Sequence, residues 1–170
     1  MHPLEHYDIL LRSRRKLLDW IRERTPQQYT QEFPFGMKTI RATVVHLADA
    51  EWLYGKRIRG EEFRFDDRPF NQERYPDLAS VERAWKDLEG STRQWLESEK
   101  DWTRRLETVS RLPGRKSMRV VFTPEKVAFQ MFYHEVHHRA QIMAMLRQMG
   151  VAAENLDFSR SAYEWTELQE

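Results

Sequence analysis

The sequence predicts an all-α protein built as a four-helix bundle. Four segments of about 20 residues carry apolar side chains at helical spacing, over residues 4–24, 39–59, 78–98 and 123–149. Helices of this length are roughly 30 Å long and suit a bundle around one core. The chain has 170 residues, of which 12% are aromatic, and large rings bury much apolar surface. We therefore expect a single domain over residues 1–170.

The first helix is predicted by a stripe whose members alternate at spacings of three and four. The stripe contains Leu4, Tyr7, Leu11, Arg14, Leu18 and Ile21. Thr25-Pro26 should end this helix, because proline disfavours helical geometry in the residue before it. Residues 26–38 are then expected to form a loop.

The second and third helices have clear boundaries in the sequence. Thr39 suits the N-cap of the second helix, and Gly60 suits its end. The 61–77 segment is charged and contains two prolines, which predicts a loop before the third helix at 78–98. The first connection is short, so the first two helices should be antiparallel. The second connection is long enough to allow a parallel pair.

Residues 106–122 lie between the third and fourth helices and differ in character. LETVS and SMRVVF favour strands and flank RLPGRK, whose Pro-Gly is a turn signal, so a β-hairpin or an extended loop is expected. Thr123, Pro124 and Glu125 are typical of a helix N-terminus, and Gly150 should close that last long helix. One more short helix is expected in the 151–170 tail.

The composition excludes several classes of function. Lys and Arg number 28 and Asp and Glu 27, a net charge of +1, which argues against a general nucleic-acid binder. No apolar run approaches the ~20 residues of a membrane span, and the N-terminus lacks the order of a secretory signal. We expect a cytoplasmic protein that binds neither membrane nor nucleic acid. The chain has no cysteine, so it has no thiolate ligand or cysteine nucleophile.

Any metal site must therefore use His, Asp or Glu. His134 and His138 are one turn apart on one helix face, and that face is otherwise mostly apolar. His46 lies within the apolar pattern of the second helix, beside small residues. Three neutral imidazoles are a common ligand set for Zn²⁺, Ni²⁺ or Fe²⁺. The alternative is that these are core histidines with satisfied hydrogen bonds.

A second motif overlaps this pair of histidines. Residues 134–138 satisfy H-E-x-x-H, the zinc-protease signature in which Glu135 would be the general base. The longer metzincin pattern fails, because it needs glycine at Gln141 and histidine at Ala144. The chain also lacks the run of strands that such proteases use, so we rank this alternative below the bundle with a histidine site.

The sequence resembles the DinB/YfiT-like superfamily of metal-dependent enzymes over nearly its whole length. The matching pieces are TIRATVVHLADAEW (39–52), FTPEKVAFQMFYHEVHHRAQIMAMLRQMG (122–150) and NLDF (155–158). Their most specific features are the histidine in the second helix and the H-x-x-x-H-R-x-Q block, which reads His134, His138, Arg139 and Gln141 here. Many relatives have glycine where this chain has Ala140, a small departure within a helix.

The resemblance implies an up-down-down-up bundle and one divalent metal ion, often nickel or zinc, with iron or manganese as further options. The matching ligands are His46, His134 and His138. It also implies a homodimer and a small-molecule substrate. Members with an activity include S-transferases that use a low-molecular-weight thiol, which we favour. A metal-dependent hydrolase and a non-catalytic metal-binding or dimerisation module are the alternatives.

Further roles near the metal are predicted with less support from the sequence. Gln141 could hydrogen-bond a metal-bound group or orient a ligand, and Asp49 is either an acceptor behind His46 or an exposed helix residue. Glu135 could serve as a base only by turning toward the metal, whereas Arg139 is expected in a structural ion pair. Residues 100–119 carry seven basic and two acidic side chains, a net charge of +5. That segment either attracts an acidic substrate or thiol cofactor or is a solvated loop, which we favour.

Overall fold

The structure is a computed structural model that describes residues 2–110, 114 and 116–167. The long helices are α1 (Pro3–Arg22), α3 (Ile40–Arg59), α4 (Leu78–Ser98) and α5 (Pro124–Gln148). The short ones are α2 (Pro26–Thr30), the 3-10 helix η1 (Phe65–Asp67) and α6 (Phe158–Ala162). A single antiparallel pair, β1 (Leu106–Ser110) and β2 (Met118–Phe122), completes the described part. A mostly helical fold is confirmed, and the sheet means that the chain is not strictly all-α.

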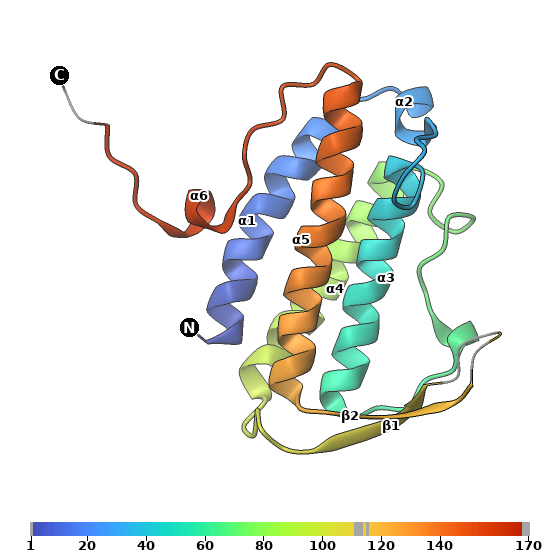
Figure 1. Cartoon of the computed structure of the whole chain (residues 1–170), viewed down its shortest axis with the longest axis vertical. Helices are drawn as coiled ribbons and strands as arrows, with labels where there is room; N and C mark the ends of the chain where they lie inside the picture. Colours follow the sequence, from blue (N-terminus) through green and yellow to red (C-terminus); the bar gives the residue numbers. More distant parts are fainter. Residues whose placement is uncertain (1, 111–113, 115, 168–170) are drawn as a thin grey trace.

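The four long helices lie side by side, with α1 and α5 running in one direction and α3 and α4 in the other (Figure 1). α3 packs against both α4 and α5, and α1 packs against the same two helices. Among these helices in the described part of the chain, none is long and apolar enough to cross a bilayer.

The predicted helix ends are set by the residues that the sequence indicated. The Thr39 hydroxyl accepts a hydrogen bond from the N–H of Ala42 at 3.0 Å, which caps α3. Gly60 ends α3 in the left-handed conformation at φ 71°, where a side chain would be strained. Thr123 caps α5, with Pro124 as its first residue.

The prediction of a continuous loop over 26–38 is wrong, because that segment begins with α2. Thr25 accepts a hydrogen bond from the N–H of Gln28, and the Gln28 side chain accepts one from the N–H of Thr25. This reciprocal capping box starts a new helix at Pro26 instead of merely ending α1. α2 buries Tyr29 against the core.

The hairpin expected between the third and fourth long helices is present. Leu106 pairs with Phe122 and Ser110 with Met118 in antiparallel register. The predicted Pro-Gly turn falls partly on 111–113, which lie outside the described residues. In Figure 1 the hairpin crosses the ends of the long helices, at the opposite end from α2. The short helix expected in the tail is α6.

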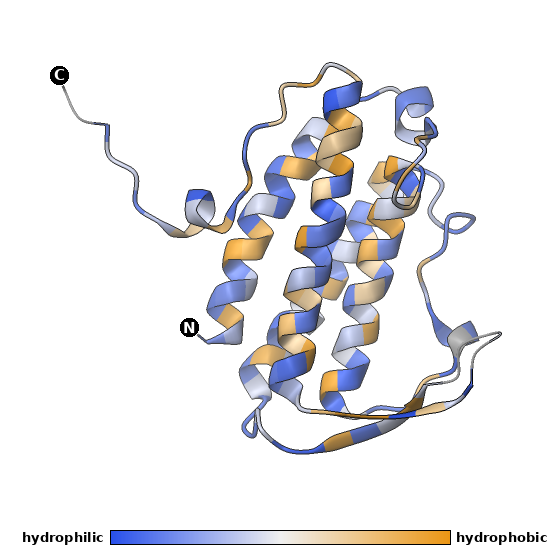
Figure 2. Cartoon of the chain, viewed as in Figure 1, coloured by the Kyte–Doolittle hydropathy of each residue, from blue (hydrophilic) through white to orange (hydrophobic). Residues whose placement is uncertain are grey.

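The apolar core has two parts that follow one another along the bundle axis. One contains Ile21, Val44 and Ile142, and the other contains Leu11, Ile58 and Phe132. Buried polar residues lie between these two clusters on every long helix (Figure 2 shows the mixed colouring along them). The members of this polar layer are the buried Arg14, Asp49, Glu51, Thr92, Glu135, His138 and Arg139 and the partly buried His46, Glu89 and His134.

Candidate metal centre

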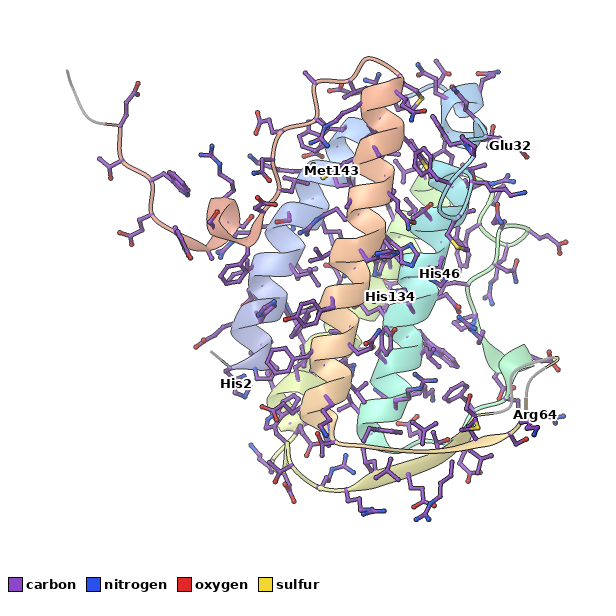
Figure 3. The ribbon with its side chains drawn as sticks, in the orientation of Figure 1. His2, Glu32, His46, Arg64, His134 and Met143 are labelled. Carbon is purple, nitrogen blue, oxygen red and sulfur yellow. The ribbon has the colours of Figure 1, made fainter. Side chains whose placement is uncertain are left out.

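Three histidines converge between α3 and α5 within the polar layer. One nitrogen from each of His46, His134 and His138 lies within 4.8 Å of the other two. The Nε2 atoms of His46 and His134 are 3.2 Å apart, and Figure 3 shows the two rings facing each other across the helices. Two imidazole nitrogens bound to one tetrahedral zinc ion are about 3.3 Å apart, given bonds of about 2.0–2.1 Å. The spacing therefore fits shared coordination.

Partial burial keeps these imidazoles neutral near pH 7. Burial, together with the smaller effects of the nearby His138 and Arg68, lowers the pKa of His46 to about 4. Burial also lowers the pKa of His134 to about 4, helped by the other histidines. Neutral imidazole is the form that binds a metal ion. The cluster is thus in its ligating state without any further proton loss.

Gln141 orients one of the three ligands. Its Oε1 accepts a hydrogen bond from Nδ1 of His138 at 2.9 Å, and its Nε2 donates to Nε2 of His137 at the same distance. A proton held on Nδ1 leaves Nε2 of His138 as the free lone pair. Of the two roles predicted for Gln141, the structure supports ligand orientation. His137 itself is exposed and is not a member of the cluster.

A comparison of the sequence with known protein families identifies the family of this chain. The model of the DinB family matches residues 1–169. The chain belongs to the DinB family. No curated protein sequence matches it. The resemblance that the sequence suggested is therefore confirmed at the level of the family.

The loop before α3 supports Gln141 in this DinB protein, which the sequence did not reveal. Gly36 has φ +58°, and a Cβ atom placed on it would lie 2.6 Å from Oε1 of Gln141. The Gln141 amide is held by two histidines and cannot move away without breaking their hydrogen bonds. Glycine at this position thus serves both the backbone conformation and the close approach to the amide.

Asp49 does not act on His46. Its side chain is buried rather than exposed, and it forms an ion pair with Arg68 from the loop that follows η1. Its Oδ1 atom has no hydrogen-bond partner within the described residues. Both alternatives predicted for Asp49 are therefore unsupported. The pair brings Arg68 close enough to lower the pKa of His46.

Glu135 faces away from the histidines and binds Arg14 of α1. Nε of Arg14 donates to its Oε1 at 3.1 Å, and Nη2 of Arg14 donates to Oε2. Because that carboxylate is held by the Arg14 guanidinium of α1, it is not directed at the histidine cluster as a base. The sheet also makes no substantial contact with α5. The zinc-protease interpretation of H-E-x-x-H is thereby excluded.

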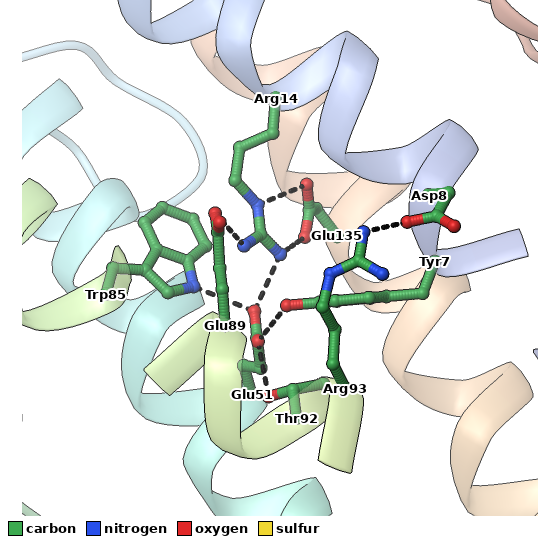
Figure 4. A network of polar contacts seen from close by, with 9 residues as sticks. All are labelled: Tyr7, Asp8, Arg14, Glu51, Trp85, Glu89, Thr92, Arg93 and Glu135. Carbon is green, nitrogen blue, oxygen red and sulfur yellow. Dashed lines mark hydrogen bonds and ion pairs between the residues drawn. The ribbon is translucent and has the colours of Figure 1, made fainter. Parts of the chain in front are cut away.

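Arg14 is the centre of a buried network that joins all four long helices (Figure 4). Besides Glu135 of α5, it contacts Glu51 of α3 at 2.6 Å and Glu89 of α4 at 3.3 Å. Burial alone would lower the pKa of Arg14, but Glu135 and Glu51 raise it well above the ordinary value. The guanidinium also lies 4.1 Å from the centre of the Trp85 ring. The sequence placed Arg14 on the apolar stripe but did not identify its partners.

Glu51 has every lone-pair direction engaged. It accepts hydrogen bonds from the Tyr7 hydroxyl, the Trp85 indole and the Thr92 hydroxyl at 2.6, 2.8 and 2.7 Å. Together with Arg14 these donors satisfy a carboxylate that is 2% exposed. The network is thus a structural junction beside the metal centre, with no open position for a substrate.

The basic 100–119 segment is removed from the histidines. Its described residues form the hairpin region at the end of the helices, whereas His46 and His134 lie midway along them (Figure 3). Arg104 is paired with Glu99 and donates to the carbonyl of Ile58, and Arg119 is paired with Glu107. These contacts agree with the solvated-loop alternative.

Proposed function

We propose that this DinB protein holds one divalent metal ion, nickel or zinc, on His46, His134 and His138. The observation that carries the proposal is the convergence of three neutral imidazole nitrogens within 4.8 Å. The orientation of His138 by Gln141 supports it, because metal-bound histidines normally have their other nitrogen hydrogen-bonded. The family match supports it as well.

We further propose that the protein is an enzyme that transfers a low-molecular-weight thiol to a small-molecule substrate. A divalent ion supplies Lewis acidity, which lowers the pKa of a thiol that reaches it. The thiol must come from a cofactor or substrate, because the chain has no cysteine. His46 and His134 are only half-buried, so an external ligand has access to them.

The remaining parts of the proposal concern the whole chain. We propose that the four long helices form an up-down-down-up bundle, and their directions in Figure 1 support this. The single domain over residues 1–170, the homodimer and the cytoplasmic location stay predictions. The alternatives in function are a hydrolase at the same metal site and a non-catalytic module.

Metal content per chain tests the site. We expect about one equivalent of nickel or zinc in the wild type after dialysis, and near-complete loss in His46→Ala, His134→Ala and His138→Ala. His2→Ala is the matched control, because it removes an exposed histidine that lies outside the cluster and does not contact Gln141. Full occupancy in the three cluster variants would refute the assignment.

The reaction needs a separate assay. The loaded protein is mixed with a low-molecular-weight thiol and an electrophile, and the S-conjugate is measured by mass spectrometry. We expect the conjugate to form faster than with His134→Ala. Absence of conjugate with every thiol tested would exclude the transferase and leave the metal site intact. Ester or amide hydrolysis under the same conditions would then favour the hydrolase.

A further inference from the structure

A second concave site lies between α1, α5 and the start of α6, away from the histidines. It is a pocket of about 320 Å³. Its walls are mainly apolar and aromatic, from Ile9, Leu10, Phe129, Phe132, Val136 and Phe158. At 100° per residue, Val136 is about 200° around α5 from His134, so the pocket and the histidine cluster occupy nearly opposite faces of that helix. Figure 1 shows the tail descending beside α1 to form this side of the molecule.

Arg139 lines the pocket and has unused hydrogen-bonding capacity. Its side chain is 5% exposed, and Nη2 donates to the carbonyl of Leu156 at 3.1 Å. Nη1 is buried and has no hydrogen-bond partner in the described part of the chain. No ion pair of Arg139 is found there either, so the structural ion pair expected from the sequence is not observed. Burial lowers the pKa of Arg139, and the charges of Glu135 and Asp157 offset this only in part. An acceptor at the unpartnered Nη1 would therefore be stabilising.

The other polar residues around the pocket are hydrogen-bonded, stacked or, like Tyr133, exposed to solvent. The Ser13 and Ser161 hydroxyls are 2.8 Å apart and join α1 to α6. His6 stacks on Phe132 with ring centres 4.3 Å apart. The carboxylate of Asp157 accepts a hydrogen bond from Asn155 at 2.8 Å. Arg139 is therefore the residue in this set with a buried nitrogen that lacks a hydrogen-bond acceptor.

We propose that this pocket binds a small carboxylate with an aromatic or branched apolar body. The apolar walls take the body, and the acid group is the acceptor that Nη1 of Arg139 lacks. The volume falls at the lower end of the roughly 300–1,000 Å³ range of ligand pockets, which suits a body of one or two rings. Asp157 at the same pocket weakens the binding of an anion without preventing it. The site is independent of the proposed metal.

The test compares an acid with a neutral molecule of the same shape. Binding of 2-naphthoate and of 2-naphthalenemethanol is measured by isothermal titration calorimetry on the full chain. We expect one naphthoate per chain, bound at least about tenfold more tightly than the alcohol, because a charged hydrogen bond to a buried group discriminates by about that factor. Equal affinities would overturn the proposal.

Variants locate the bound acid. Arg139→Gln should remove the preference for the acid while leaving the alcohol bound, and Arg139→Lys should restore part of it. Asp157→Asn should tighten the acid alone. An acid preference that survives Arg139→Gln would overturn the proposal.

Three further variants test the pocket without changing Arg139, so the result does not depend on whether the Arg139 variants fold. Val136→Trp should block both molecules by filling the pocket mouth. The matched control is Val121→Trp, because Val121 is equally exposed at 44% but lies in the hairpin. His46→Ala should bind naphthoate as the wild type does. Loss of binding in His46→Ala, or unchanged binding in Val136→Trp, would place the acid elsewhere and refute the assignment.

Discussion

Gln141 determines which nitrogen of His138 is available to a metal ion. Because its Oε1 accepts the Nδ1 proton, Gln141→Leu leaves the ring free to rotate and to change tautomer. Loss of such a supporting hydrogen bond typically weakens metal affinity about 10- to 100-fold. We expect that decrease for Gln141→Leu, measured as the dissociation constant of Ni²⁺ or Zn²⁺ in competition with a chromophoric chelator.

The control and a second variant sharpen this prediction. Gln148→Leu makes the same chemical change at an exposed position near the end of α5 and should leave the affinity unchanged. Gly36→Ala should also weaken metal binding, because its Cβ would displace the Gln141 amide. Unaltered affinity in both Gln141→Leu and Gly36→Ala would mean that the hydrogen bond to His138 does not support coordination.

The lowered pKa values of the histidines predict how the metal-free protein responds to pH. His46 and His134 have a pKa of about 4 when folded, whereas an ordinary histidine has a pKa of about 6.5. Between these values the unfolded chain binds more protons than the folded one, so stability falls as the pH decreases from about 6.5 to about 4. We expect this trend in urea unfolding with a chelator present.

The matched variant for the pH response is His134→Gln, which removes one of the histidines whose pKa is lowered. Its free energy of unfolding should fall less steeply over the same window than that of the wild type. The same slope in both proteins would show that burial does not shift the pKa of His134.

At the residue scale, local spacing was informative and long-range pairing was not. The proximity of His134 and His138 follows from helical geometry, since they lie one turn apart on one face of the helix. The contact between Arg14 and Glu135 joins residues 121 positions apart, and neither helix alone specifies it. Helical periodicity placed Arg14 on an inward face, but only the packing of α1 on α5 shows which carboxylate it meets.

The guanidinium of Arg14 links the long helices within the polar layer. Replacing Arg14 therefore tests how much this link contributes to stability. Arg14→Met leaves Glu51 and Glu135 buried without their countercharge. Breaking a buried pair in this way typically costs about 3–5 kcal/mol. We expect a decrease of that size in the free energy of unfolding, measured with urea.

A surface control and a triple variant distinguish the loss of charge from the loss of packing. Arg12→Met changes an exposed residue of the same helix and should alter stability by less than about 0.5 kcal/mol. Combining Arg14→Met with Glu51→Gln and Glu135→Gln should recover part of the loss, because no buried charge then remains in these three positions. A triple variant that is less stable than Arg14→Met would contradict the electrostatic explanation.

The elements themselves were largely predictable, because their boundaries are set by local chemistry. Thr39, Gly60 and Thr123 cap helices through their own side chain or backbone conformation, and the sequence identified all three. The wrong prediction of a loop at α2 also arises from local chemistry. Thr25-Pro26 both ends α1 and starts a new helix, and only the additional hydrogen bonds with Gln28 decide for the second outcome.

Across the whole molecule, the proposed metal site lies where a bound ion can influence global stability. His46 belongs to α3, and His134 and His138 belong to α5, which are two directly packed long helices. An ion bound to all three would join helices that are separated by more than 60 residues of chain. The three histidines lie in the polar layer.

Metal binding should therefore raise the stability of the whole chain. An ion that binds only the folded state stabilises it by about 4 kcal/mol when free metal is 1,000 times its dissociation constant. We expect Ni²⁺ or Zn²⁺ to raise the unfolding temperature of the wild type by several degrees, measured by circular dichroism. Mg²⁺ should have no effect, because it prefers oxygen ligands. An equal shift in His46→Ala and the wild type would show that the ion stabilises the fold from another site.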